Sequence, residues 1–306
     1  MNVLGFDTSN YTTSIAFFDG KDGVNCSRLL PVKQGELGLR QSDAVFHHTK
    51  SLPELSGRLF SHVKGVNICA VGVSTRPRAV EGSYMPCFMV GYSHAKLMAD
   101  MLGVPLIEVS HQQGHVAASL WSAGRLDLMD TPHLAWHLSG GTTELLLVEP
   151  DGKNVKCSRI GGTTDISAGQ LIDRTGVMLE LPFPAGKHVD ALSKTACGRE
   201  VFKVKCPETE FSFSGLQNKV QQFYQTKGDA SETAAYTLRC VAYAVRKATE
   251  NALNAYPGLE VVFSGGVASN SMLREIVADL KPVFCEPQFS TDNAMGVAVL
   301  TYRMRS

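Results

Sequence analysis

The sequence lacks net charge, paired cysteines and long hydrophobic runs. Lys and Arg total 29 and Asp and Glu total 29, so the formal net charge is zero. No general electrostatic field therefore favours nucleic acid, which could bind only at a local basic patch. No apolar run approaches the ~18 residues of a membrane-spanning helix, so we expect no membrane segment.

The chain also lacks a Cys-x-x-Cys pair, and we expect no signal peptide from its first residues. Its eight cysteines lie at positions 26, 69, 87, 157, 197, 206, 240 and 285. Disulfide frameworks are typical of small secreted domains, whereas scattered cysteines in a mid-sized chain are usually reduced and buried. The N-terminus leads directly into the apolar segment Val3–Phe6, without the basic and apolar regions of a leader. We therefore expect a cytoplasmic protein.

Two segments of the same plan predict an internal duplication. With 306 residues, of which 44% are hydrophobic, the chain is long enough for two domains with sizeable cores. Asn2–Thr8 and Thr12–Asp19 read as the strands of a hairpin, and His133–Leu138 and Glu144–Val148 repeat this plan around a polar turn. We expect one domain at 1–130 plus about 288–306, a second at 131–287, and a ligand cleft between them.

Apolar periodicity elsewhere predicts alternating helices and strands, which is typical of an α/β protein. The predicted helices are Leu52–Val63, Met85–Leu102, Ser110–Ala123, Ile166–Thr175, one that holds Asp190, Ser231–Ala255, one from Ser271 onward, and Ala294–Met304. The further predicted strands are Ile68–Ser74, Val104–Val109, Val155–Ser158 and Glu260–Ser264. Residues 31–50 read as a polar, glycine-containing segment, and the role of Phe211–Leu216 stays open.

His111 and His115 form the pair around which the predicted site is arranged. Residues four apart lie on one face of a helix, so both imidazoles could bind one divalent ion. Two ligands do not complete a metal shell, and Asp292, in a turn before the last predicted helix, is the candidate for the third. Such pairs are also common as solvated histidines, and the spacing alone leaves both interpretations open.

Three loops have a composition that suits anions. Gly265 and Gly266 stand between a strand and a helix, where glycines let backbone amides approach phosphate. The short polar turn between the first two predicted strands, which contains Asn10 and Tyr11, could present amides and hydroxyls in the same way, although ordinary hairpin turns have the same composition. The loop Thr75–Arg78 contains two arginines, which suit anionic ligands but are often merely solvated at a surface.

Read in order, these motifs resemble the TsaD/YgjD family, the tRNA N6-adenosine threonylcarbamoyltransferases. The matching segments are Val3–Gly5 with Thr8 and Ser9, Val90 and Gly91 with Ala95 and Lys96, His111 and His115, Ser139–Gly141, Asp165 with Gly169 and Asp173, Pro184 and Gly186, Phe211–Leu216, Gly265–Asn270 with Leu273 and Arg274, and Thr291–Ala294. The resemblance covers nearly the whole chain. It implies the actin-like ATPase fold (ASKHA, ribonuclease H-like), a duplication with two domains around a nucleotide cleft.

The resemblance also implies ligands and site residues. One divalent metal, iron or zinc, would be bound by His111, His115 and Asp292, since two histidines and a carboxylate suit several metals. The residues expected to hold an adenine nucleotide or acyl-adenylate are Leu138, Ser139, Gly140, Gly141, Thr142, Asp173, Gly186, Asp190, Gly265, Gly266 and Asn270. Asp7 and Ser9 are candidate catalytic side chains. The implied reaction moves a threonylcarbamoyl group from threonylcarbamoyl-AMP to N6 of adenosine 37 in tRNA.

Several positions depart from the family pattern. Acidic family residues are replaced by Tyr11, Thr12, Ile166 and Gln170, the family histidine after the Ser-Gly-Gly turn is Thr142, and the Gly-Pro-Gly loop is Arg76-Pro77-Arg78. These changes remove acids and add cations in segments that the family directs to its cleft. In a cleft of low dielectric, such changes alter the electrostatic energy of a charged ligand by roughly several kcal/mol.

Three functional hypotheses follow. The first is the family reaction, by an enzyme that works on tRNA and assembles as a homodimer or with a shorter paralogue and a small ATPase. The second is a paralogue that carbamoylates another acceptor. The third is a nucleotide-binding assembly partner without activity. A peptidase is not expected, because Gln112, beside His111, cannot take a proton as the glutamate of a His-Glu-x-x-His site does.

Overall fold

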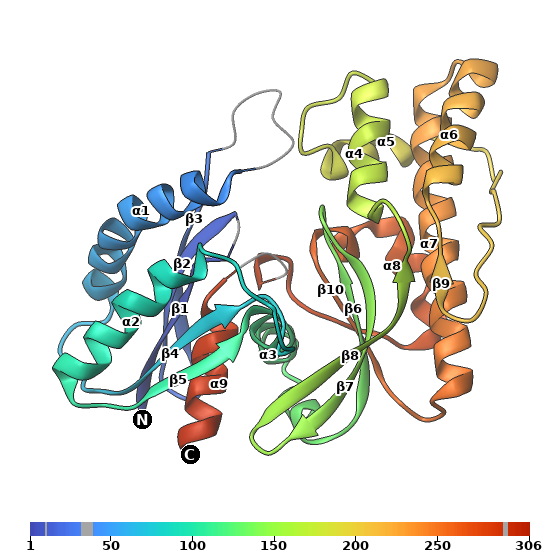
Figure 1. Ribbon diagram of the computed structural model, residues 1–306. Coiled ribbons are helices and arrows are strands. Elements are labelled where there is room, and N and C mark those ends of the chain that lie inside the picture. The colour runs from blue at the N-terminus through green and yellow to red at the C-terminus, as the bar shows by residue number, and fades with distance from the viewer. Residues whose placement is uncertain (10, 32–38, 290–292) are drawn as a thin grey trace. The chain divides into compact units, whose positions relative to one another are not determined.

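In the computed structural model (Figure 1), residues 1–9, 11–31, 39–289 and 293–306 are described, and the chain divides into two compact units. Unit 1 comprises Met1–Thr131, Glu149–Cys157 and Gln288–Ser306. Unit 2 comprises Pro132–Val148 and Ser158–Pro287. Each unit contains its own mixed sheet covered by helices, and each is treated by itself below.

Unit 1 is built on a five-stranded sheet of order β3-β2-β1-β4-β5. Its strands are β1 (Asn2–Asp7), β2 (Thr12–Phe18), β3 (Gly23–Leu29), β4 (Ile68–Arg76) and β5 (Leu106–Ser110). Its helices are α1 (Gln41–His62), α2 (Phe88–Leu102), α3 (His111–Ser122), α9 (Met295–Arg305) and the short 3-10 helix η1 (Leu126–Asp130). β1 is antiparallel to β2 and parallel to β4, which is parallel to β5.

Alternation along β1 explains how both faces of this sheet are covered. Leu4 and Phe6 point to the face where they share a core with α1 and α2. Gly5 points to the opposite face, where a Cβ atom would lie 2.6 Å from the backbone nitrogen of Ala298 in α9. Figure 1 shows α1 and α2 on one side of the sheet and α9 on the other. Because β1, β4 and β5 are parallel, their carboxyl ends lie at one edge of the sheet, which carries the polar residues after β1 and the histidine pair after β5.

Unit 2 is built on a six-stranded sheet of order β11-β10-β6-β7-β8-β9. Its strands are β6 (His133–Leu138), β7 (Thr143–Asp151), β8 (Asn154–Thr163), β9 (Glu210–Phe211), β10 (Val261–Ser264) and β11 (Val283–Phe284); the turn of the β7–β8 hairpin belongs to unit 1. Its helices are α4 (Ala168–Met178), α5 (Gly186–Ser193), α6 (Ser214–Lys227), α7 (Ala230–Ala255) and α8 (Ser271–Ile276), with the 3-10 helices η2 (Gly266–Ser269) and η3 (Ala278–Leu280). The 3-10 helix η4 (Pro287–Phe289) starts at the last residue of unit 2 and continues in unit 1.

The sheet of unit 2 repeats the plan of unit 1. β6 is antiparallel to β7 and parallel to β10, and β10 is parallel to β11. In the same way, β1 is antiparallel to β2 and parallel to β4, and β4 is parallel to β5. The core is centred on Trp136 of β6, which is fully buried and donates from Nε1 to Oγ1 of Thr249 in α7 over 2.8 Å. A buried indole nitrogen needs such an acceptor. The shared strand order supports the predicted duplication.

Most predicted elements are confirmed, with shifted ends, but several expectations were wrong. The helix predicted at Leu52–Val63 begins earlier, at Gln41; the predicted loop Thr75–Arg78 begins inside β4; and β8 extends through Thr163, beyond the predicted end at Ser158. The predicted helix that holds Asp190 is α5, which starts at Gly186. β3 and α6 were not predicted.

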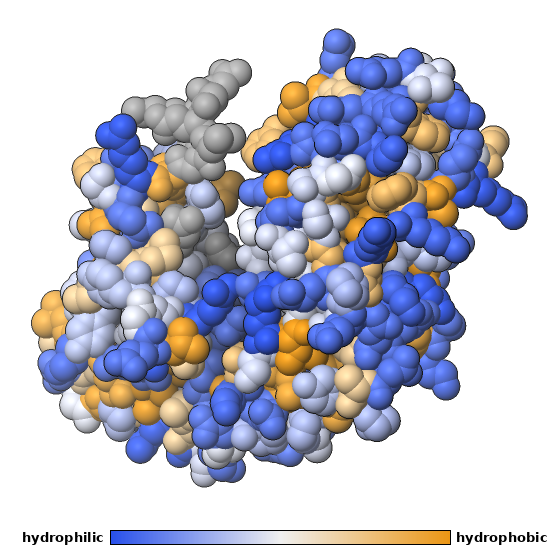
Figure 2. Space-filling view, turned by 45° about the vertical axis from the view of Figure 1, so that its right-hand side comes forward, coloured by the Kyte–Doolittle hydropathy of each residue, from blue (hydrophilic) through white to orange (hydrophobic). Residues whose placement is uncertain are grey.

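The surface mixes polar and apolar side chains. On the face that Figure 2 shows, hydrophobic residues are interspersed among hydrophilic ones. Within residues 1–9, 11–31, 39–289 and 293–306, no helix combines the length and the apolar character needed to cross a bilayer.

Candidate active site

The N-terminus of α3 fixes the position of the histidine pair. Ser110 is the N-cap: its Oγ accepts from the Gln113 backbone N–H over 3.2 Å, and its own N–H donates to Gln113 Oε1 over 2.9 Å. Such a capping box satisfies two otherwise unpaired amide donors and sets the first turn. The Gln113 side chain is buried and also donates to the Val155 carbonyl. His111 is therefore the first residue of a helix whose start is held in place.

The two imidazoles meet through the same ring atom. Nε2 of His111 lies 2.9 Å from Nε2 of His115, and the ring centroids are 4.3 Å apart. Nδ1 of His111 lies 2.9 Å from Oδ2 of Asp7. Nδ1 of His111 thus faces a carboxylate and its Nε2 faces Nε2 of His115, so one ion could bind both Nε2 atoms when no proton lies between them.

Asp7 is the centre of a buried polar network at the end of β1. Its side chain is 1% exposed; Oδ1 accepts from Ser74 Oγ over 2.5 Å, and Oδ2 accepts from Ser9 Oγ over 3.2 Å. A buried carboxylate is costly unless such donors surround it. The network thus ties the ends of β1 and β4 to His111, whose side chain is 19% exposed.

A third histidine lies buried behind this network. His48 of α1 is fully buried, and its Nδ1 lies 2.8 Å from Oγ1 of Thr13 in β2. Burial lowers the pKa of His48 to about 4, although the charge of Asp7 acts in the opposite direction. His48 is therefore neutral at neutral pH and takes no part in the predicted pair.

The residues present fit a divalent metal. A histidine that binds metal through one nitrogen usually donates from the other to a carboxylate, which is the arrangement of His111 and Asp7. Asp292, the predicted third ligand, lies outside the described residues. Within the described ranges, no cluster of three or more His, Cys, Asp or Glu side chains suits a metal. The pair at His111 and His115 supplies two ligands, and the identity of the others stays a prediction.

The predicted nucleotide-binding turn of unit 2 is anchored to α4. The Ser139 N–H donates to the Thr142 carbonyl over 2.8 Å, which closes the turn between β6 and β7. Ser167, the N-cap of α4, donates to the Gly140 carbonyl over 2.6 Å. A Cβ atom on Gly169 would lie 2.5 Å from Gly140 Cα, so only glycine allows the turn and the helix to approach this closely.

Gly265 brings a second loop against the same turn. Its φ of +91° is a conformation that L side chains rarely adopt, and a Cβ atom there would lie 2.1 Å from the Leu138 carbonyl oxygen. By contrast, four of the predicted glycines have no atom within 4 Å of the place where a Cβ would stand: Gly140, Gly141, Gly186 and Gly266. Glycines thus serve two purposes here, close packing and open backbone.

The predicted acidic residues of unit 2 are already engaged within the protein. Oδ1 of Asp173 accepts from the Ala185 N–H over 2.8 Å at the start of α5, and burial raises the pKa of Asp173. Oδ1 of Asp190 accepts from Asn270 Nδ2 over 2.7 Å and from the N–H and Oγ of Ser271. The structure therefore brings Asp190 and Asn270 together, and Asp173 beside Gly186.

The departures from the family pattern have structural roles. Thr12 is buried as the first residue of β2, and Gln170 forms a capping box with Ser167 at α4. Ile166 packs against the core of unit 2. The new residues thus fit their local structure.

Sequence reasoning missed the partners of the predicted residues. Ser74 and His48 were not singled out, although Ser74 ends a predicted strand, and Asp165 was noted only as a motif match. Burial alone would raise the pKa of Asp165, but hydrogen bonds from Ser212, Ser214 and Phe213 outweigh burial and lower it. Asp165 thereby holds the segment whose role was open.

Comparison with known proteins identifies the family. Residues 35–299 match the family model for tRNA N6-adenosine threonylcarbamoyltransferase. The protein of that name from Carboxydothermus hydrogenoformans is 31% identical over 318 residues, covering 98% of this chain and 91% of the relative.

Two solved structures confirm the predicted actin-like ATPase fold. The phosphate- and nucleotide-bound form of HypF aligns with a TM-score of 0.62 at 15% identity, over 99% of this chain and 46% of HypF, so the chain spans about half of that protein. The ROK hexokinase from Thermus thermophilus aligns with a TM-score of 0.54 at 14% identity, over 100% of this chain and 99% of the hexokinase. At these identities the likeness shows the fold alone. On the sequence matches, the chain belongs to the tRNA N6-adenosine threonylcarbamoyltransferase family.

Proposed function

We propose that this protein transfers a threonylcarbamoyl group from threonylcarbamoyl-AMP to N6 of adenosine 37 in tRNA, using a divalent ion bound by His111 and His115. The observation that carries the proposal is the meeting of the two Nε2 atoms at 2.9 Å, with His111 oriented by Asp7, in a chain of this family. The predicted third ligand is Asp292, and iron and zinc both suit the set.

The described residues have separate tasks at this site. When bound, the ion supplies a Lewis acid for the carbonyl of the transferred group. Asp7 holds Nδ1 of His111 in place, and Ser74 and Ser9 donate to Asp7, which fixes the orientation of its buried carboxyl group. Each of these groups binds or orients, and none forms a covalent bond to the substrate.

We assign the adenylate to the predicted residues of unit 2. The open backbone at Gly140, Gly141 and Gly266 supports phosphate binding, because amides can approach a ligand where no side chain intervenes. Asp173 and Asp190 suit ribose hydroxyls. In both residues Oδ1 already accepts hydrogen bonds, so we expect Oδ2 to accept from the ribose; Oδ2 of Asp190 would do so beside the exposed Lys194, whose Nζ lies 3.5 Å from it.

A second candidate function is transfer to another acceptor. Thr12 and Gln170 stand where the family has acids. Thr12 is the first residue of β2, and Gln170 belongs to the capping box of α4. Their neutral side chains change the charge that an incoming amine would meet. Binding of tRNA, a shorter paralogue and a small ATPase stay predictions of the family resemblance.

Metal content and transfer activity of the full chain test the proposal together. We expect about one metal ion per chain in the wild type, lost in His111→Ala, His115→Ala and Asp292→Ala, with transfer to tRNA lowered at least about 100-fold. His62→Ala, which removes an exposed histidine of α1, is the matched control and should retain both. Transfer to a small amine but not to tRNA would favour the second candidate, and nucleotide binding without metal or transfer would refute both.

A further inference from the structure

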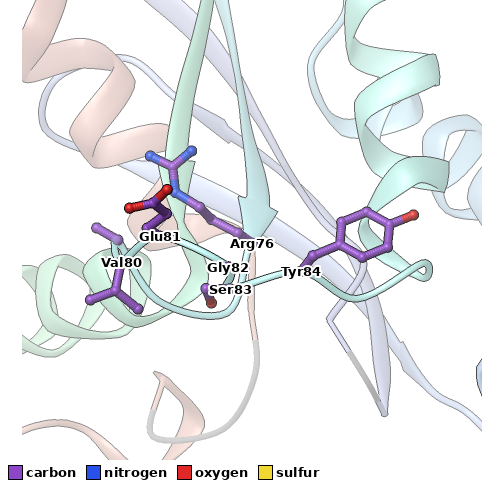
Figure 3. A pocket seen from close by; sticks show the side chains of 7 residues that line it. Arg76, Val80, Glu81, Gly82, Ser83 and Tyr84 are labelled. Carbon is purple, nitrogen blue, oxygen red and sulfur yellow. The ribbon is translucent and has the colours of Figure 1, made fainter.

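A cavity of about 410 Å³ lies in unit 1 where β4 ends and the next loop begins (Figure 3). It is lined by Arg76 and by residues 79–84. None of these residues was assigned to the metal or to the nucleotide. The cavity contains one cation, Arg76, one acid, Glu81, and the hydroxyls of Ser83 and Tyr84.

The Arg76 guanidinium is available to a ligand. The residue is half-buried, and its side chain forms neither a hydrogen bond nor an ion pair with any residue in the described part of the chain. In Figure 3 the side chains of Arg76 and Glu81 point to the same side of the loop, whereas Tyr84 points away. A guanidinium always carries its charge and presents five donors in a planar fork that matches a carboxylate or a phosphate.

Strand pairing places this cavity next to the histidine pair. Arg76 of β4 pairs with Ser110 of β5, the residue directly before His111. The Gln112 N–H also donates to the Pro77 carbonyl over 3.0 Å, which ties the loop to the first turn of α3. Ligands of open α/β sheets bind beyond the carboxyl ends of parallel strands, which is where Arg76 and His111 both lie.

We propose that Arg76 is an anion-binding residue that holds the carboxylate of the donor substrate beside the histidine pair. The inference rests on the proposed function, because the acyl group of that donor carries a carboxylate, whereas its phosphate is assigned to unit 2. A bidentate pair with Arg76 would fix the orientation of the acyl group before transfer. The negative charge of Glu81 repels an anion in the same cavity and therefore lowers its affinity.

The test measures binding of two small anions to the metal-free full chain, so that it does not depend on transfer or on metal. N-carbamoyl-L-threonine supplies the carboxylate, inorganic phosphate supplies the phosphate, and ligand-observed NMR titration gives the dissociation constants. Arg76→Gln should weaken binding of N-carbamoyl-L-threonine about tenfold or more, and Arg76→Lys should weaken it less. Glu81→Gln should tighten the same probe about two- to fivefold.

Matched controls make the result decisive. Arg58→Gln, which removes an exposed arginine of α1, should leave both constants unchanged. Binding of phosphate to unit 2 should not depend on Arg76. The measured quantity is therefore the difference in dissociation constant between the Arg76 variant and the wild type. If only phosphate, or neither probe, responds to Arg76→Gln while urea unfolding shows an intact fold, the inference is wrong, whatever the transfer assay gives.

Discussion

In unit 1 the candidate site consists of side chains, and each is held by another: Ser74 and Ser9 donate to Asp7, and Asp7 orients His111. In unit 2 the candidate site consists mostly of backbone, and glycines decide how closely its loops approach, as Gly265 does against Leu138. The same strand plan therefore supports two kinds of site. The site of unit 1 should be sensitive to the loss of a charge or a hydrogen bond. The site of unit 2 should be sensitive to the addition of a single carbon atom.

The largest expected effect comes from Gly265→Ala. The new Cβ would lie 2.1 Å from the Leu138 carbonyl oxygen, at a residue whose φ is +91°. Overpacking and backbone strain together should lower the free energy of unfolding by about 2–4 kcal/mol, measured by urea denaturation. Gly266→Ala, at the neighbouring open position, is the control and should change it by less than about 0.5 kcal/mol. Equal effects at both positions would remove the distinction between packed and open glycines.

Asp7→Asn tests the opposite property in unit 1. It preserves size but removes the carboxylate that orients His111, and loss of such a partner typically weakens metal binding about 10–100-fold. Competition with a chromogenic chelator for zinc would measure the affinity. Asp22→Asn, an exposed aspartate of unit 1, should leave it unchanged. A metal affinity in Asp7→Asn within about twofold of the wild type would show that the buried network does not orient the pair.

How far the sequence predicts these sites depends on how local their signals are. The α3 helix was predicted because Ser110 and the following periodicity are adjacent in sequence, and the hairpins were predicted by alternation around polar turns. The first half of α1 was missed because its buried positions are Ala44, His48 and Ser51, which do not form an apolar stripe. α6 was missed because only Leu216 and Val220 are buried in it.

Long-range partners could not be predicted in the same way. Asp7 and His111 are 104 residues apart, and Asp190 and Asn270 are 80 apart. Which side chains meet at such separations follows from strand order and register, and a single sequence does not specify either. The sequence therefore indicated most of the candidate residues of each site but not the network that holds them.

The smallest expected effect concerns pH. Because burial lowers the pKa of His48 to about 4, the unfolded chain, with an ordinary histidine pKa near 6.5, binds more protons between these values. Stability contributed by neutral His48 is therefore complete above about pH 6.5 and is lost as the pH falls towards 4. From pH 7 to pH 6 the free energy of unfolding should decrease by about 0.5–1 kcal/mol more in the wild type than in His48→Gln. Urea denaturation at both pH values measures this, and His62→Gln, in the exposed part of α1, should follow the wild type. If His48→Gln shows the wild-type pH dependence, then the side-chain network of unit 1 tolerates a charged histidine, and its contrast with unit 2 is smaller than the geometry implies.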